Sequence, residues 1–398
     1  MTDLSESLVG LGVEVTALAA RGRYNGGDSL PPQTNYKGVR ITRTWASSFG
    51  KVSTVGRLAD YFSFYVTAAW KLLTLPRHDI VMALTTPPLI SVPALIICRL
   101  RQMKMVALVQ DLYPDVAVAL GTLKAERLTT RMFDALNRFV LSRADRVIVL
   151  GECMRERVAA KVGREARARI DVIHNWADGS VLEPIPESDN NPFVQQERHH
   201  SEFVVQFSGN LGRVNDFETV LDAAERLRQR PDIVFEFIGD GAMADRLRTA
   251  SHEKDLNVRF LPYQPRELLK FTLAAGDAHL VTLASGLSGL SVPSKTYGIL
   301  AAERPIIFVG DIGSDIARLV SENECGSVIA SGDGEGLAHT ITQWAECREQ
   351  PKLMGQSARR LFESRFDRPR AVNDYLTSFA SCLNSTPTRL SAQLKPEG

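Results

Sequence analysis

The chain of 398 residues is too long for a single compact core, and we expect two domains of ordinary size. Its 47 basic residues nearly balance its 46 acidic residues, which argues against nucleic acid as the main partner. The five cysteines lie far apart, without the spacing of a zinc or redox motif, so we expect reduced thiols in a cytoplasmic protein.

The first half of the chain alternates predicted helices and strands. Leucines at helical spacing predict a helix over residues 4–11, and residues 13–18 alternate like a strand. Residues 21–38 are rich in glycine, proline and asparagine and predict a loop. Further strands are predicted over 39–42, 79–84, 104–110, 146–150 and 170–174, and further helices over 57–73 and 125–143. Such alternation indicates a mostly parallel sheet covered on both faces.

One uncharged stretch, residues 80–98, is near the minimum length for crossing a bilayer. It contains Pro87, Pro88 and Pro93, so a buried strand, a turn and a short helix explain it better than a membrane span does. The first residues have neither a basic segment nor an apolar segment, and they do not form a signal peptide.

A linker is predicted between the two halves over residues 181–200, which are rich in proline, asparagine and acidic residues. The adjacent His199 and His200 lie in it without carboxylate or cysteine partners, so we interpret them as solvated. The N-terminal domain is therefore predicted over residues 1–180 and the C-terminal domain over residues 201–365.

The second half again alternates strands and helices and predicts another doubly wound domain. Asn215 and Glu218 have the spacing of a capping box at a helix start. A late helix is predicted over residues 366–383 and a disordered tail over residues 384–398. Strands are predicted over 203–207, 233–238, 258–263, 278–283 and 305–309.

Three loops of the second half follow strands and contain glycine: 208–213, 239–241 and 285–291. In a doubly wound sheet, ligands bind beyond the carboxyl ends of the strands. Two of these loops are followed by a cation, Arg213 and Lys295 respectively. Together they favour a site for a nucleotide diphosphate.

The segment after the third loop, Val292-Pro-Ser-Lys295, predicts a helix that begins at Lys295 with Ser294 as its N-cap. Free backbone N–H groups and the helix dipole favour an anion at such a position. Lys295 adds a cation there. Two interpretations remain open, a diphosphate-binding corner and a solvated lysine at a helix start.

These motifs resemble family 4 retaining glycosyltransferases, in particular the bacterial surface-polysaccharide branch (O-antigen, colanic acid and amino-deoxysugar). The matching segments are Phe207-Ser-Gly-Asn-Leu-Gly-Arg213, Phe237-Ile-Gly-Asp-Gly241, Val292-Pro-Ser-Lys-Thr-Tyr-Gly-Ile-Leu-Ala-Ala-Glu-Arg-Pro305, Val109-Gln-Asp-Leu-Tyr-Pro-Asp115 and Val172-Ile-His-Asn-Trp-Ala-Asp178. The resemblance implies the GT-B architecture, in which two Rossmann-like domains face each other across a cleft. It also implies that the helix at 366–383 crosses back onto the first domain.

The resemblance further implies a donor site for a nucleotide sugar on the C-terminal domain. The residues expected to hold the diphosphate are Gly209, Asn210, Gly212, Arg213, Ser294 and Lys295. Those expected near the nucleobase are Gly239, Asp240, Gly241 and Tyr263, while Ser288, Gly289 and Leu290 are expected to meet the sugar and phosphates through backbone N–H groups.

The chemistry of the family fits these residue types. Arg213 and Lys295 would stabilise the leaving diphosphate, so neither a metal nor a cofactor is expected. The incoming hydroxyl is thought to attack on the leaving-group face, which needs no enzymic nucleophile. Asp111 ends a strand of the N-terminal domain, where it would orient or deprotonate the acceptor; capping the following turn is the alternative role.

The sequence also departs from the family. The family carries two glutamates where this chain has Leu290 and Gly298. Because the second glutamate binds the ribose in the family, the residue that binds the ribose here is left open. Gln110 stands in place of a histidine. The first strand and its glycine-rich loop, which precede the helix at 4–11 in the family, are missing. Because that strand is central, we expect exposed apolar surface and poor solubility for this chain.

The helix at 57–73 is crowded with aromatic residues. It is expected either to pack in the core or to touch a membrane or a lipid-linked acceptor, and Phe64→Asp is the substitution that would test this. A peripheral position on the inner face of the cell membrane therefore stays open beside a cytoplasmic one.

We expect an enzyme that transfers a hexose or an N-acetylaminosugar from a UDP-sugar to a polysaccharide precursor, with retention of the anomeric configuration. Whether this precursor is linked to a lipid is left open. A UDP-sugar 2-epimerase shares the architecture, and isomerisation without an acceptor would identify it. The non-enzymatic alternative is a binding subunit with the GT-B fold but without catalytic activity. The absence of the family's first strand and of its two glutamates favours this alternative.

Overall fold

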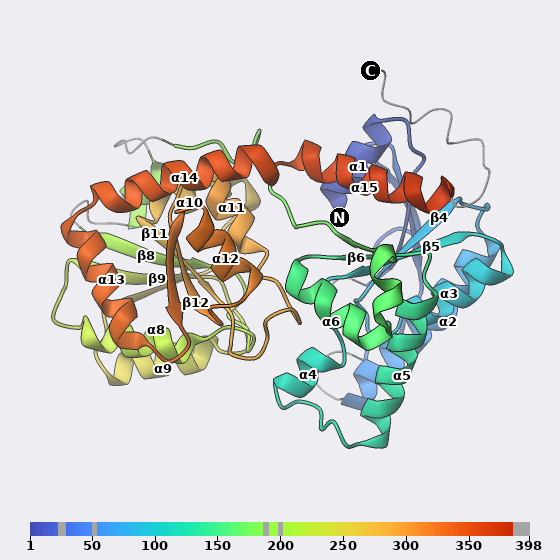
Figure 1. Cartoon of the computed structure of the whole chain (residues 1–398), viewed down its shortest axis with the longest axis horizontal. Coiled ribbons are helices and arrows are strands. Elements are labelled where there is room, and N and C mark those ends of the chain that lie inside the picture. The colour runs from blue at the N-terminus through green and yellow to red at the C-terminus, as the bar shows by residue number, and fades with distance from the viewer. Residues whose placement is uncertain (23–28, 50–53, 186–190, 198–201, 385–398) are drawn as a thin grey trace.

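The computed structural model describes residues 1–22, 29–49, 54–185, 191–197 and 202–384, which form two α/β domains joined by a long helical segment (Figure 1). The N-terminal strands are β1 (Thr16–Ala20), β2 (Gln33–Tyr36), β3 (Val39–Thr44), β4 (Ile80–Leu84), β5 (Lys104–Val109), β6 (Arg146–Val149) and β7 (Ile170–Val172). The N-terminal helices are α1 (Thr2–Gly10), α2 (Thr54–Thr74), α3 (Ser91–Leu100), α4 (Asp115–Ala119), α5 (Leu128–Arg143), α6 (Glu152–Val162) and the short 3-10 helix η1 (Arg164–Arg169).

The N-terminal sheet is divided into two parts. Four parallel strands have the order β4-β5-β6-β7, and three strands have the order β1-β3-β2. Among the described residues, no ladder joins β1 to β4. The described strands of the N-terminal domain therefore form two separate sheets.

The prediction of a loop over residues 21–38 is wrong in one part, because Gln33–Tyr36 forms the strand β2, which pairs antiparallel with β3. The turn between them is Lys37-Gly38, and both residues have positive φ angles of 48° and 84°. Two such residues make the tight turn that matches the twist of a hairpin. β2 has only four residues and three of them are exposed, so it lacked an apolar pattern.

The C-terminal domain has a six-stranded parallel sheet of the order β10-β9-β8-β11-β12-β13. Its strands are β8 (Phe203–Ser208), β9 (Ile233–Ile238), β10 (Val258–Leu261), β11 (Ala278–Thr282), β12 (Ile306–Gly310) and β13 (Gly326–Ala330). Its helices are α7 (Pro192–Glu197), α8 (Phe217–Arg226), α9 (Ala244–Glu253), the short 3-10 helix η2 (Arg266–Leu268), α10 (Leu269–Ala275), α11 (Lys295–Ala301), α12 (Asp315–Glu322), α13 (Gly334–Glu346) and α14 (Glu349–Arg365). The strands β9, β11 and β12 are buried throughout, as expected of a parallel sheet covered on both faces.

The helix cap expected at Asn215 is wrong. α8 begins after Asp216, whose carboxylate accepts a hydrogen bond from the Thr219 backbone N–H at 3.2 Å. Asp216 therefore satisfies one of the free N–H groups of the first turn. The Asn215 side chain is engaged in the loop before the helix instead.

The last helix crosses between the domains, as the resemblance implied. α14 lies on the C-terminal domain, and α15 (Arg368–Asn384) lies on the N-terminal domain beside α1 (Figure 1). Val372 and Tyr375 of α15 are buried in one apolar cluster with Leu4 and Leu8 of α1. At the crossing, Arg368 forms an ion pair with Asp178 at 2.9 Å.

The predicted linker, 181–200, contains one element that belongs to the C-terminal domain. α7 lies within it, and Phe193 is buried against Ile238 and Ala275. His199 and His200 lie outside the described residues, and so does the predicted tail apart from Asn384, the last residue of α15. Residues 80–98 form β4 and α3, as predicted. Among the described helices, none is long and apolar enough to span a bilayer.

Candidate functional site

The loops that follow β8 and β9 touch each other at the carboxyl end of the C-terminal sheet. Gly209 and Gly239 have positive φ angles of 139° and 135°, and a Cβ on Gly239 would overlap the carbonyl oxygen of Gly209. The backbone N–H of Leu211 donates to the Asp240 carbonyl at 2.9 Å, and the Tyr263 hydroxyl donates to the same carbonyl at 3.1 Å. Glycine is required here because the two loops approach so closely.

Two asparagine side chains, Asn210 and Asn215, lie against these loops. A Cβ on Gly241 would lie 2.6 Å from Oδ1 of Asn210, so that glycine too is fixed by a close approach. The Asn215 amide donates to the Gly212 carbonyl at 3.0 Å and accepts from the Thr282 hydroxyl at 3.1 Å. Asn215 therefore ties the loop after β8 to the end of β11, which explains why it does not cap α8.

Lys295 points its ammonium group into the protein beside the loop after β8. Its Nζ is buried, lies 3.1 Å from the centroid of the Phe207 ring, and has no hydrogen-bond partner among the described residues. A Cβ on Gly209 would lie 3.7 Å from this Nζ. Burial lowers the pKa of Lys295 well below its usual value. The interpretation as a solvated lysine is therefore wrong, and an unpaired cation faces the glycine loop.

Two residues expected at the same corner are placed differently. Ser294 occupies the N-cap position of α11, but its backbone is helical and its side chain makes no capping hydrogen bond. Arg213 is exposed, and within the described part of the chain its side chain has no hydrogen bond or ion pair. The structure thus brings Lys295 against the loop, while Arg213 lies at the rim, as does the exposed ring of Tyr263.

The loop 285–291 is bonded to both domains. At its start, the Ser285 hydroxyl and the Gly286 N–H donate to the Asp311 carboxylate of the C-terminal domain at 3.1 and 3.0 Å, and its later residues contact the N-terminal domain. The Ser288 carbonyl accepts a hydrogen bond from Arg157 at 2.6 Å, and a Cβ on Gly289 would lie 2.6 Å from the carbonyl oxygen of Cys153. The Leu290 carbonyl accepts from the Leu112 N–H at 2.8 Å.

One of the N–H groups expected to meet the ligand is already in use. The Leu290 N–H donates to the Leu287 carbonyl at 2.9 Å, which closes a turn inside the loop. The predicted ligand contact of this N–H is therefore wrong, and the contacts of Ser288 and Gly289 stay predictions. Leu290 and Gly298, where the family carries glutamates, have apolar surroundings, since Leu290 is buried and a Cβ on Gly298 would meet two leucine side chains.

Asp111 lies at the junction of the two domains. Its Oδ1 accepts a hydrogen bond from the Ser291 hydroxyl at 2.6 Å, and the two residues form an antiparallel bridge. Burial raises the pKa of the Asp111 carboxyl, and the hydrogen bond from Ser291 partly opposes that rise. Within the described residues, its carboxylate bonds across the junction and does not cap the following turn.

A second cluster at the junction carried no sequence signal. The Asp315 carboxylate accepts from the Cys153 backbone N–H at 3.0 Å, at the start of α6, and pairs with Arg318 at 2.9 Å. Acidic groups at a helix N-terminus are stabilising because they face unpaired N–H groups. From the sequence, Ser314 and Asp315 indicate only the start of α12, which Ser314 indeed caps. The described residues contain no cluster of three or more histidine, cysteine or acidic side chains suited to a metal ion.

Comparison with known proteins matches both halves of the chain. Residues 1–176 match the family described as "Glycosyl transferase 4-like domain", and residues 189–361 match "Glycosyl transferases group 1". The protein named "Probable glycosyltransferase WbjE" of Pseudomonas aeruginosa is 32% identical over 290 residues, which are 73% of this chain and 72% of that protein. "Putative colanic acid biosynthesis glycosyl transferase WcaI" of Escherichia coli K12 is 26% identical over 278 residues, 67% of this chain and 66% of that protein.

The fold also has counterparts among solved structures. Alr3699/HepE of Anabaena, solved in complex with UDP-glucose, superposes with a TM-score of 0.67 at 16% sequence identity. The superposition covers 85% of this chain and 86% of that one. At this level of identity the likeness concerns the fold alone, which is two α/β domains that meet at a junction.

Proposed function

The chain belongs to the glycosyltransferase family with a 4-like N-terminal domain and a group 1 C-terminal domain, and it has the GT-B fold. On that basis, we propose that it transfers a sugar from a UDP-sugar to a lipid-linked precursor of a surface polysaccharide, with retention of the anomeric configuration. The donor would lie on the C-terminal domain at the loops after β8, β9 and β11. The acceptor would lie on the side of Asp111.

The observation that carries the proposal is the unpaired ammonium of Lys295 beside the glycine loop at Gly209. A buried cation without a partner is costly, and an anionic ligand that supplies oxygen acceptors removes that cost. The glycines bring backbone close to this point without side chains. A nucleoside diphosphate offers both the negative charge and the narrow shape that such a corner accepts.

In the proposed reaction, the acceptor hydroxyl attacks the anomeric carbon on the face of the leaving group. The bond between that carbon and the phosphate oxygen breaks, and the nucleoside diphosphate departs with its electron pair. Lys295 would stabilise the charge that develops on the diphosphate. Asp111, whose raised pKa reflects burial, would accept the proton of the hydroxyl at the junction.

The named proteins support the finer parts of the proposal. WcaI is named for colanic acid biosynthesis, which supports a polysaccharide product. HepE binds UDP-glucose in its solved complex, which supports UDP as the nucleotide. Retention and a lipid-linked acceptor come from the resemblance of the motifs to their family.

Nucleotide-dependent thermal stability tests the donor site. The purified protein would be melted with UDP, GDP, ADP and dTDP, next to Lys295→Ala and to Lys352→Ala, a control at an exposed position of α14. Nucleotide at one hundred times its Kd stabilises a protein by about 2.7 kcal/mol. We expect stabilisation by UDP in the wild type and in the control, and its loss in Lys295→Ala. No stabilisation by any nucleotide would contradict the proposed donor site.

A transfer assay tests the rest. The protein would be incubated with UDP-sugars and a lipid extract, and the anomeric configuration of the product would be read by NMR. A product of inverted configuration would contradict retention, and transfer only to water-soluble acceptors would contradict the lipid-linked precursor.

A further inference from the structure

One face of α2 is an apolar stripe that is exposed in the structure. Its members are 43% to 69% exposed: Leu58, Phe62, Val66, Trp70 and Leu73. At about 100° per residue, these positions fall within about 120° of the helix circumference. The expectation of plain core packing for this helix is therefore wrong for this face. Phe64, whose substitution by aspartate was expected to test a membrane contact, is half-buried and lies off the stripe.

Two more exposed aromatic residues lie in the segment before α2, beside this helix. Trp45 and Phe49 are 61% and 69% exposed. The Thr67 hydroxyl donates to the Trp45 carbonyl at 2.6 Å, and Asp60 accepts from the Phe49 N–H at 3.0 Å. Asp60 is the only acidic residue of α2. Because it is bonded to this loop, it holds the aromatic residues in place.

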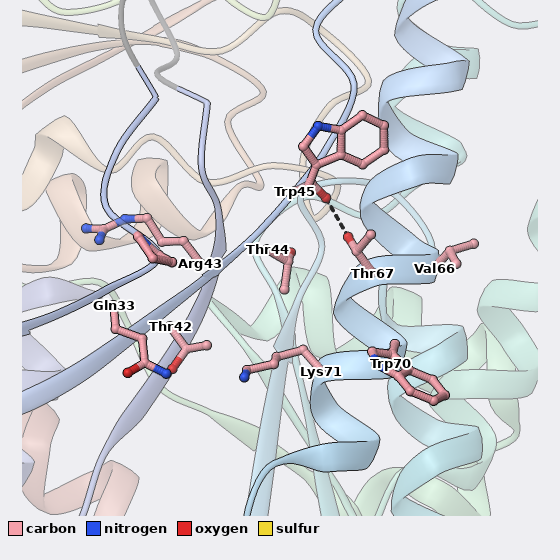
Figure 2. A pocket seen from close by; sticks show the side chains of 10 residues that line it. Gln33, Thr42, Arg43, Thr44, Trp45, Val66, Thr67, Trp70 and Lys71 are labelled. Carbon is pink, nitrogen blue, oxygen red and sulfur yellow. Dashed lines mark hydrogen bonds between the residues drawn. The ribbon is translucent and has the colours of Figure 1, made fainter.

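A pocket of about 550 Å³ opens along α2, between this helix and the strands β2 and β3 (Figure 2). Val66 and Trp70 belong to both the stripe and the pocket wall. Arg43 and Lys71 also line it, and none of the lining residues is acidic. Figure 2 shows Lys71 reaching from α2 toward Thr42 of β3.

The polar groups of the pocket have unmet hydrogen-bonding capacity. The hydroxyls of Thr42 and Thr44, whose residues are 1% and 7% exposed, are buried without a partner in the described part of the chain. The Lys71 ammonium has no hydrogen bond or ion pair among the described residues. Arg43 uses one nitrogen on the Pro31 carbonyl and the Thr34 hydroxyl. Two cations and two free hydroxyls favour an anion rich in acceptor oxygens.

We propose that α2 and this pocket dock the enzyme on an anionic membrane, with the stripe among the lipid chains and a head-group phosphate in the pocket. A pocket for a free phosphate would need no apolar rim, and a protein interface would not need the unpaired cations. A membrane surface supplies apolar chains and anionic phosphates side by side. The inference rests on the N-terminal domain alone and holds whatever the donor sugar is.

Vesicle flotation at low and high salt tests the proposal, with vesicles of phosphatidylcholine alone or mixed with phosphatidylglycerol. The variants are Phe62→Ser with Trp70→Ser for the stripe, and Lys71→Gln for the pocket. The matched controls are Ile312→Ser and Lys352→Gln, both at exposed positions of the C-terminal domain. All substituted side chains of the stripe are largely exposed, so folding is expected to survive, and melting curves check this.

We expect the wild type and the controls to float with the mixed vesicles and to be released by salt. The stripe variant should lose roughly tenfold or more in partitioning to the mixed vesicles. Lys71→Gln should lose severalfold on the mixed vesicles and nothing on neutral ones. Equal flotation of all variants would overturn the proposal. A wild-type dimer that the stripe substitutions dissociate would also overturn it. So would binding of millimolar inorganic phosphate to the pocket that leaves the flotation of the wild type with the vesicles unchanged.

Discussion

Replacing Lys295 by methionine removes a buried charge while keeping a side chain of similar length. The ammonium lies 3.1 Å from the centroid of the Phe207 ring and has no hydrogen-bond partner among the described residues. A thioether is compatible with an aromatic neighbour and carries no charge to desolvate. We therefore expect Lys295→Met to fold, to be at least as stable as the wild type without ligand, and to bind nucleotide poorly.

The pH dependence has a definite sign. Burial holds the pKa of Lys295 in the folded protein well below the 10.5 of an unfolded lysine. Between the two values the unfolded chain binds more protons, so the free energy of unfolding of the wild type rises with pH in that window. One proton contributes a slope of at most about 1.4 kcal/mol per pH unit. Lys295→Met lacks this slope, so its advantage in stability should shrink as the pH approaches 10.5.

The loss of nucleotide binding can be bounded in the same way. A hydrogen bond from an ammonium to a phosphate oxygen contributes about 1.5–3 kcal/mol. Its removal corresponds to a rise in Kd of roughly 10- to 150-fold. Urea unfolding of the ligand-free proteins over a range of pH, and calorimetric titration with UDP, would measure both effects. Wild-type affinity for UDP in Lys295→Met would refute the reasoning, whatever happens to its stability.

Three further substitutions test the junction and the loops. Ser291→Ala removes the hydrogen bond that opposes the raised pKa of Asp111, so the acid limb of the pH–rate profile should move to higher pH; an unmoved limb would count against Asp111 as the base. Gly239→Ala places a methyl group on the Gly209 carbonyl, and urea unfolding should show a loss of about 3 kcal/mol. Asp315→Ala should cost about 1 kcal/mol and raise the KM for the donor severalfold; unchanged kinetics would show that this contact does not shape the site.

The sequence predicted the features that depend on neighbouring residues. Apolar runs between glycine-rich turns were enough to predict the C-terminal strands β8 to β12, because a strand in a parallel sheet is buried on both faces. The strand β13 at the edge of the sheet was not predicted, and only one of its five residues is buried. The predictions failed where a contact with a residue far away in the sequence determines the local structure. Asn215 and Asp216 are adjacent and equally able to cap a helix, and the hydrogen bond from Thr282 engages Asn215 in the loop instead.

The aromatic helix shows another limit. Residues 61–65 include four aromatic side chains nearly in succession, so they spread over about 160° of the circumference of α2. Periodicity could not say which of them face solvent, and the structure exposes Phe62 while Tyr61, Phe64 and Tyr65 are half-buried. The contacts at the junction of the two domains could not be predicted from local sequence patterns. Asp111 and Ser291 are 180 residues apart in the sequence, and nothing near either of them indicates their hydrogen bond.

The two halves of the proposed donor site have different supports. The loops after β8 and β9 are bonded to each other and to β11, all within the C-terminal domain. The start of the loop 285–291 is bonded to Asp311 of the C-terminal domain, whereas residues 288–290 are bonded to the N-terminal domain, through Arg157 to the Ser288 carbonyl and through Leu112 to the Leu290 carbonyl. Separation of the domains would leave the loops after β8 and β9 intact and release residues 288–290, which are expected to meet the sugar. Nucleotide binding should therefore survive substitutions at the junction that abolish transfer, because transfer requires the loop and Asp111 together.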